Sequence, residues 1–143
     1  MEKISIVVPC YNEETVLSLF YDEMKQVMSQ MNYVEFELIF VDDGSKDKTL
    51  DKIKELKRVD NRVHYVSFSR NFGKEAAIFA GFTESTGDYV AMMDADLQDP
   101  PSLLEEMFTC IKDEGYDSVA TEEYLEMVNL KFVPFMQDDS INL

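Results

Sequence analysis

The chain contains the run Tyr89-Val90-Ala91-Met92-Met93-Asp94-Ala95-Asp96-Leu97-Gln98-Asp99-Pro100-Pro101, in which an apolar segment gives way at once to acidic residues. An uninterrupted apolar segment of this kind is typical of a strand that is buried on both faces of a parallel sheet. The acidic residues then follow the carboxyl end of that strand. The run therefore predicts an internal strand that carries polar side chains to one edge of a sheet.

The oxygen-bearing side chains after this strand form a candidate metal site. Asp94 and Asp96 are separated by one residue, and Gln98 follows two positions later. Carboxylate and amide oxygens are the hard ligands that Mg²⁺ and Mn²⁺ prefer, and these ions usually keep positions for water or a phosphate. The alternative is a loop whose acidic residues only face water, because such pairs are common in acidic proteins. This run alone leaves both interpretations open.

The composition fits one acidic domain. A chain of 143 residues is long enough to bury a hydrophobic core. It carries 13 Lys and Arg against 29 Asp and Glu, which gives a net charge of −16. Because so negative a surface repels nucleic acid and anionic lipid, we expect neither as a partner through bulk charge. Cys10 and Cys110 match neither a zinc pattern nor a disulfide scaffold, which predicts reduced thiols and a cytoplasmic location.

Strands and helices are expected to alternate along the chain. Short apolar or β-branched runs predict strands at 4–8, 36–41, 63–68, 89–93 and 117–121. Apolar residues at spacings of three and four predict helices between them, with Asn12 and Ser45 as the first two N-caps. The third helix, 75–83, is rich in small residues that permit close packing on a sheet, and the fourth runs from Ser102 to Gly115. This order predicts an α/β fold, with a mostly parallel sheet and helices on both faces.

Polar clusters follow four of the expected strands. They are Pro9-Cys10-Tyr11-Asn12-Glu13, Asp42-Asp43-Gly44-Ser45, Arg70-Asn71-Phe72-Gly73-Lys74 and Asp94-Ala95-Asp96-Leu97-Gln98-Asp99. Because the carboxyl ends of parallel strands share one edge, where ligands of such sheets bind, the clusters are expected to meet there. Tyr11 favours stacking on a base, whereas helix capping explains Asn12 and Glu13 equally well. Asp42 and Asp43 by themselves fit an ordinary turn, so their role depends on the convergence.

The clusters resemble the motifs of the family 2 glycosyltransferases. Within that family they are most similar to the polyprenyl-phosphate sugar transferases, of the dolichyl-phosphate mannosyltransferase and bactoprenol glucosyltransferase type. The resemblance covers residues 4 to about 121 and rests on Ile6-Val7-Val8-Pro9-Cys10-Tyr11-Asn12-Glu13-Glu14, Val41-Asp42-Asp43-Gly44-Ser45, Ser69-Arg70-Asn71-Phe72-Gly73-Lys74-Glu75-Ala76-Ala77 and Met93-Asp94-Ala95-Asp96-Leu97-Gln98-Asp99-Pro100-Pro101. It implies the GT-A fold, a Rossmann-like three-layer sandwich around a mostly parallel central sheet.

The resemblance also implies an activity and a set of site residues. A sugar is transferred from a nucleotide diphosphate donor, of the UDP-glucose or GDP-mannose type, to a polyprenyl phosphate or another glycan acceptor. A divalent cofactor, Mg²⁺ or Mn²⁺, is held by Asp94, Asp96 and Gln98. Asp42 would hydrogen-bond the base, and Arg70 and Lys74 would point at the diphosphate or the base. The residues so assigned to the nucleotide sugar are Pro9, Tyr11, Asn12, Glu13, Asp42, Asp43, Arg70, Lys74 and Asp94.

The end of the chain departs from the family pattern. Glu122-Glu123-Tyr124 stands where family members carry an arginine-rich segment, and the general base is expected in an acceptor half that is missing here. We therefore expect 1–121 to form a truncated donor domain and 122–143 a divergent tail without an assigned role, helical or irregular over 122–135. The hypothesis is that this chain binds nucleotide sugar and metal but transfers weakly or not at all. An apolar face exposed by the missing half predicts a homodimer.

A receiver-like phospho-switch domain is the alternative from a different functional class. Such a domain also carries an acidic metal site on a parallel five-stranded sheet, but its acidic pair follows the first strand and a lysine follows the fifth. Here the acidic clusters follow the second and fourth expected strands, and Glu122-Glu123 follow the fifth. These positions disfavour the receiver.

Overall fold

The structure, a computed structural model, describes residues 1–98, 100–115, 118–120 and 126–129. In this part of the chain, strands and helices alternate up to the fifth strand, as expected. The strands are β1 (Lys3–Cys10), β2 (Glu35–Asp42), β3 (Val63–Ser67), β4 (Tyr89–Met92), β5 (Ser118–Ala120) and β6 (Glu126–Asn129). The helices are α1 (Leu17–Gln30), α2 (Thr49–Val59), α3 (Lys74–Glu84) and α4 (Leu103–Glu114).

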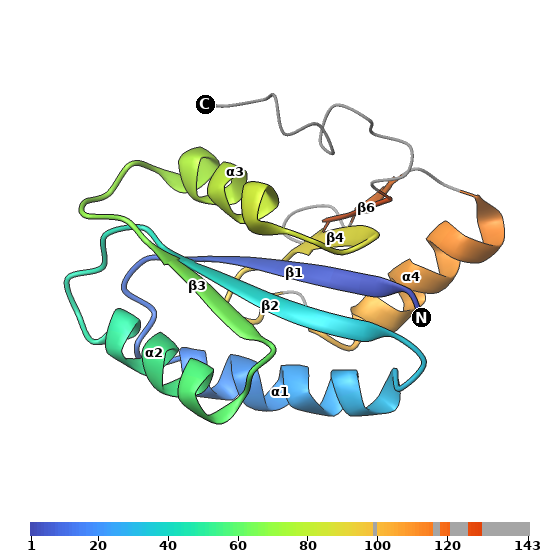
Figure 1. Cartoon of the computed structure of the whole chain (residues 1–143), viewed down its shortest axis with the longest axis horizontal. Coiled ribbons are helices and arrows are strands. Elements are labelled where there is room, and N and C mark those ends of the chain that lie inside the picture. The colour runs from blue at the N-terminus through green and yellow to red at the C-terminus, as the bar shows by residue number, and fades with distance from the viewer. Residues whose placement is uncertain (99, 116–117, 121–125, 130–143) are drawn as a thin grey trace.

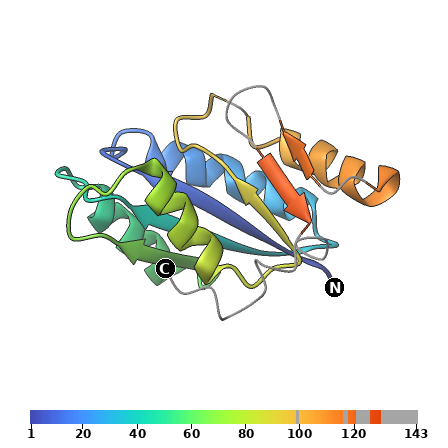
Figure 2. The same cartoon turned by 90° about the horizontal axis from the view of Figure 1, so that it is seen from above.

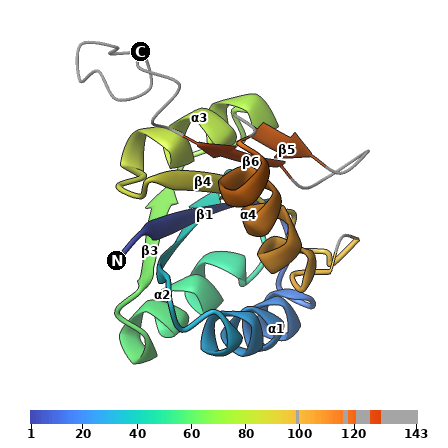
Figure 3. The same ribbon diagram turned by 90° about the vertical axis from the view of Figure 1, so that its right-hand side faces the viewer.

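The strands form one sheet in the order β3-β2-β1-β4-β6-β5. Figure 1 labels β3, β2, β1, β4 and β6, and Figure 3 labels β5 beside β6. The strands β3, β2, β1 and β4 are all parallel, and β6 pairs antiparallel with both β4 and β5. The expected mostly parallel sheet is therefore confirmed. The expectation of a helix or irregular segment over 122–135 is wrong for residues 126–129, because they fill the open edge of β4 as a strand, with Met127 fully buried.

Helices cover both faces of the sheet and make three layers (Figure 3). The helices α1, α2 and α4 share one core with the side chains that alternate along one side of β1, among them Ile4, Ile6 and Val8. The helix α3 lies on the opposite face, where Ala77 packs with Ile39 and Val41 of β2. The described residues contain no helix long and apolar enough to cross a bilayer.

Two helix starts differ from the expectation. The helix α1 begins at Leu17 and α2 at Thr49, so neither Asn12 nor Ser45 is an N-cap. Asn12 has a φ of 55°; its N–H donates to Ser45 Oγ over 2.9 Å, and its side-chain oxygen accepts from the Lys46 N–H over 2.9 Å. The two side chains therefore join the loops after β1 and β2 to each other instead of capping the helices that follow.

The other two helices lie close to their expected positions. The helix α4 follows Ser102 and ends at Gly115, which has the left-handed backbone that favours glycine there. The helix α3 packs tightly on the sheet at Gly81, where an added Cβ would lie 2.2 Å from Cγ1 of Val7. This close contact seats the second half of α3 directly on β1.

Candidate functional site

A cavity of about 260 Å³ opens at the carboxyl edge of the sheet. Figures 1 and 2 both place the loops that follow β1, β2 and β3 together at this end of the molecule. Residues from all four polar clusters line the cavity, so the expected convergence is found. The lining residues are Pro9, Cys10, Tyr11, Glu13, Asp43, Lys74, Ala77, Asp94 and Asp96.

Asp43 fastens the loop after β2 to the loop after β3. Its buried carboxylate accepts hydrogen bonds from the backbone N–H of Phe72 at 2.7 Å and of Gly73 at 3.1 Å, and from Asn71 Nδ2 at 3.2 Å. Gly44, with a φ of 71°, lets the loops approach, since an added Cβ would lie 2.3 Å from the Arg70 carbonyl carbon. Because α3 begins directly after this loop, Asp43 also fixes the position of Lys74.

Lys74 forms an ion pair with the first aspartate of the run after β4. Its Nζ lies 2.8 Å from Asp94 Oδ1, and the Asp94 side chain is 17% exposed against 58% for Lys74. Asp96 is exposed, and its Oδ1 accepts the backbone N–H of Gln98 over 3.2 Å. The side chain of Gln98 is exposed and does not line the cavity, and Asp99 lies outside the described residues.

The cavity concentrates negative charge around Lys74. Burial raises the pKa of the Glu13 carboxyl, as do the charges of Asp96 and Asp94, while Lys74 lowers it. Burial also raises the pKa of the Cys10 thiol well above its usual value, with Glu13 among the carboxylates that add to the shift. The thiol is therefore neutral and unsuited to act as a nucleophile.

The structure leaves four of the expected site residues outside the cavity lining. Asn12 links two loops, and Asp42 is buried with Oδ1 accepting the Ser45 N–H over 3.3 Å. The Arg70 guanidinium lies over the Phe72 ring, 4.7 Å from its centroid, and Gln98 is exposed. Conversely, Cys10 and Ala77 line the cavity without an expected role. The only feature of the sequence that could have indicated this role is position, since Cys10 ends a strand and Ala77 lies in the first turns of α3.

The donor atoms at the cavity fit a hard cation by their chemistry. Glu13, Asp94 and Asp96 present carboxylate oxygens to the same space. Among the described residues, however, no group of three or more His, Cys, Asp or Glu is arranged to hold a metal ion by itself. Mg²⁺ in general is bound through one or two carboxylates and keeps other coordination positions for water or phosphate oxygens.

Comparison with known proteins identifies the family. The model of glycosyl transferase family 2 matches residues 5–133. The chain is 48% identical over 119 residues to the putative glycosyltransferase CsbB of Bacillus subtilis, covering 83% of this chain and 36% of that protein. It is 46% identical over 107 residues to the bactoprenol glucosyl transferase of Shigella phage SfX, covering 72% and 35%. The chain thus spans about a third of the length of these curated relatives, 36% and 35%.

Solved structures share the fold. The mannosyltransferase PcManGT from Pyrobaculum calidifontis, in complex with GDP-Man and Mn²⁺, superposes with a TM-score of 0.79 at 17% identity, over 94% of this chain and 46% of that chain. TarS of S. aureus in complex with UDP superposes with a TM-score of 0.62 at 26% identity, over 81% and 34%. The fold is that of the GT-A glycosyltransferases. With the four motifs in place and most of its length matched, the chain belongs to glycosyl transferase family 2.

Proposed function

We propose that this chain is the donor domain of a glycosyltransferase that binds a nucleotide diphosphate sugar together with a divalent ion. The observation that carries the proposal is a cavity at which loops after β1, β2 and β4 and the start of α3 meet around carboxylates and one lysine. The relatives support this proposal, because they include proteins named as bactoprenol glucosyl transferases and as an undecaprenyl-phosphate sugar transferase. Complexes of structural neighbours with GDP-Man and Mn²⁺ or with UDP-GlcNAc point the same way.

In this proposal the side chains divide between the nucleoside and the diphosphate. Tyr11, 42% exposed at the cavity, is free to stack on the base beside Pro9. Asp42 is assigned to the base, and because it is buried outside the cavity lining, reaching the base would require the loop after β2 to shift. Arg70, whose guanidinium lies over Phe72 in the structure, would turn from the neighbouring loop toward the diphosphate or base. Asn12 and Asp43 act by holding the loops at the spacing that the nucleotide requires.

Asp94, Asp96 and Gln98 are the proposed ligands of Mg²⁺ or Mn²⁺. When bound, the ion would supply Lewis-acid neutralisation of the diphosphate leaving group. Asp96 and Gln98 are exposed to solvent, and the hydrogen bond from the Gln98 backbone N–H to Asp96 Oδ1 keeps the two residues on the same short turn. Asp94 is the more buried of the two aspartates and would face the ribose or the diphosphate.

The acceptor and the location belong to the same proposal. We place a polyprenyl phosphate or another glycan as acceptor, with residues 1–121 as the donor domain and the general base outside it. Transfer by this chain alone is then weak or absent, although donor binding remains. Cys10 and Cys110 are both free thiols, which supports a cytoplasmic site.

Calorimetric titration of UDP-glucose and GDP-mannose, with and without Mn²⁺, tests the proposal. One of the two donors should bind, and more tightly with the ion. Asp96→Asn should weaken Mn²⁺-dependent binding by more than the roughly 10–100-fold typical of losing an outer-shell partner. The control Asp22→Asn, an exposed aspartate on α1, should bind like the unaltered chain. Binding of neither donor would contradict the proposal, and labelling of an aspartate by acetyl phosphate without nucleotide binding would favour the receiver.

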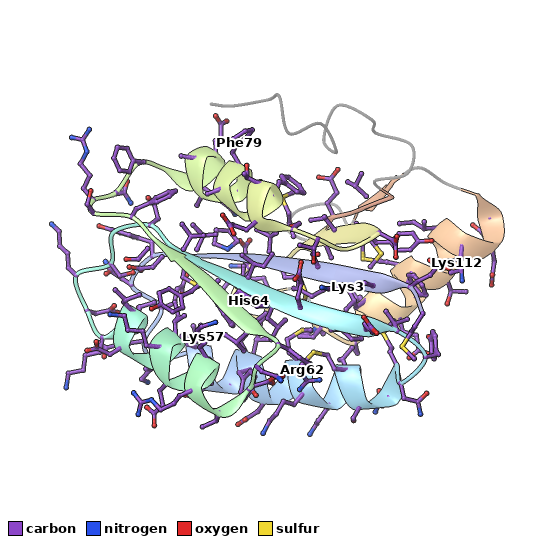
Figure 4. The ribbon with its side chains drawn as sticks, viewed as in Figure 1. Lys3, Lys57, Arg62, His64, Phe79 and Lys112 are labelled. Atoms are coloured by element: carbon purple, nitrogen blue, oxygen red, sulfur yellow. The ribbon has the colours of Figure 1, made fainter. Side chains whose placement is uncertain are left out.

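A homodimer remains a prediction of the sequence. Phe79 is 37% exposed and points outward from α3, away from the sheet (Figure 4). If Phe79 contributes to contact between two copies, Phe79→Ser should shift the sedimentation coefficient toward that of the monomer. A chain that sediments as a monomer at all accessible concentrations would contradict the prediction.

A further inference from the structure

We propose that Lys74 is a built-in counter-ion that makes divalent metal binding at Asp94 conditional on the arrival of the diphosphate. This inference rests on the proposed function and adds a coupling mechanism to it. Without a diphosphate, Lys74 holds Asp94. When a diphosphate enters, its oxygens offer the ammonium group a second partner and leave Asp94 available to the cation.

The ion pair is the first observation. Lys74 Nζ lies 2.8 Å from Asp94 Oδ1, and in the described part of the chain Lys74 is the one basic side chain that lines the cavity. Four carboxylates line the same cavity. Asp43 already accepts hydrogen bonds from the loop before α3 on both of its oxygens, so Lys74 is left to balance Glu13, Asp94 and Asp96.

The position of Lys74 in its helix is the second observation. Lys74 is the first residue of α3. The amino end of a helix carries partial positive charge, so a cation there is disfavoured unless an anion compensates it. Asp94 provides that compensation in the structure, and a bound diphosphate would provide it equally. Gly73, with a φ of 102°, and the Asp43 hydrogen bonds fix the backbone from which Lys74 extends.

The difference in exposure indicates which partner moves. The Lys74 side chain is 58% exposed, whereas that of Asp94 is 17% exposed. A long, exposed lysine side chain can change partners at little cost, because an exposed ion pair contributes little stability. The more buried Asp94 stays in place as the fixed member of the site.

The energetic consequence is coupling between the two ligands. A free cation that approaches Asp94 must displace an ammonium group, which lowers its affinity. With a diphosphate present, that displacement has already occurred, and the phosphate oxygens add ligands. By thermodynamic linkage the ion and the diphosphate then strengthen each other's binding by the same factor, typically about 5–150-fold.

Binding measurements on the 143-residue chain at low salt test this inference. The affinity of Mn²⁺ alone, of UDP and GDP alone, and of each nucleotide with saturating Mn²⁺ would be measured by calorimetry. Lys74→Gln should tighten Mn²⁺ alone several-fold, weaken the nucleotide alone, and reduce the coupling factor to the part that direct contact between the ion and the phosphate oxygens supplies. Lys74→Arg retains the charge and should keep most of the coupling. The control Lys48→Gln, exposed and outside the cavity lining, should change none of these values.

The outcomes separate this inference from the proposed function. If the unaltered chain binds nucleotide and Mn²⁺ cooperatively and Lys74→Gln retains the same coupling, the role of Lys74 is refuted while the donor site stands. Weaker binding of Mn²⁺ alone to Lys74→Gln would refute it as well. If the unaltered chain binds neither UDP nor GDP with Mn²⁺, both proposals fail.

Discussion

Asp60 is a buried carboxylate that joins two elements away from the cavity. It accepts hydrogen bonds from Arg62 Nε at 3.0 Å and Nη2 at 2.8 Å, and from the Tyr21 hydroxyl at 2.6 Å. Arg62 marks this position near α1 in Figure 4. The hydrogen bonds from Arg62, together with that from Tyr21, hold the pKa of Asp60 well below its usual range despite burial. Burial and the bond to Asp60 raise the pKa of Tyr21 to about 12.

The depressed pKa of Asp60 predicts an acid-sensitive contribution to stability. Because the folded pKa lies below the unfolded value of about 3.9, the contribution is complete above that value and is lost as the pH falls through the folded pKa. Asp60→Asn should lower the free energy of unfolding at pH 7 by about 1–3 kcal/mol. The variant should also lose less stability than the unaltered chain between about pH 4 and pH 2.

Urea unfolding at several pH values measures this effect. The control Asp113→Asn, exposed near the end of α4, should leave the acid dependence unchanged. Equal acid sensitivity of Asp60→Asn and the unaltered chain would show that the Tyr21–Asp60–Arg62 contacts do not stabilise the fold.

At the scale of elements, the packing of α3 against the sheet fixes the position of Lys74 in the site. Gly81 lies against Val7 of β1, where an added Cβ would come within 2.2 Å of a methyl group on a stiff, fully buried side chain. In an open helix, replacing glycine with alanine gains about 1 kcal/mol. Here the gain is opposed by overpacking, which costs about 1–3 kcal/mol and moves the helix.

We expect Gly81→Ala to lower the melting temperature and to weaken nucleotide binding, since displacing α3 also displaces Lys74. Thermal unfolding and calorimetry measure the two effects. In a double-mutant cycle, Val7→Ala should relieve the overpacking, so that the two substitutions cost less together than the sum of their separate effects. A higher melting temperature for Gly81→Ala alone would contradict this account of the packing.

At the scale of the whole molecule, negative charge dominates. The chain carries 29 acidic against 13 basic residues. A net charge far from zero keeps a protein soluble but destabilises its compact state by self-repulsion. Salt screens exposed charges, with a Debye length of about 10 Å at 0.1 M.

The melting temperature at pH 7 should therefore rise when KCl is increased from about 20 mM to about 300 mM, a range over which screening strengthens. At about pH 4.5, where the carboxylates approach protonation, the same addition should have a smaller effect. Differential scanning calorimetry measures both. A melting temperature that falls with KCl at pH 7 would mean that specific ion pairs outweigh the net repulsion.

The periodicity of the chain was sufficient to predict the alternating strands and helices that precede residue 121. Burial of one face of a strand or helix leaves a periodic pattern of apolar residues close together in the sequence. Such patterns are present in the apolar runs at 4–8 and 89–93 and in the helical spacing between strands. The crossover rule then places the carboxyl ends of parallel strands at one edge, so the meeting of Tyr11, Asp43 and Asp94 could be predicted without coordinates.

Contacts between segments that are distant in the sequence could not be predicted from local periodicity. Asn12 looks like a helix cap, yet its partners are Ser45 and Lys46, and the strand at 126–129 exists because β4 offers it an open edge. In the sequence, Arg70 and Lys74 are two basic residues of the same cluster, and nothing near them distinguishes their roles. Only the packing of α3 on the sheet brings Lys74 to Asp94 and leaves Arg70 on Phe72, because that choice depends on where a helix rests and not on the residues next to it.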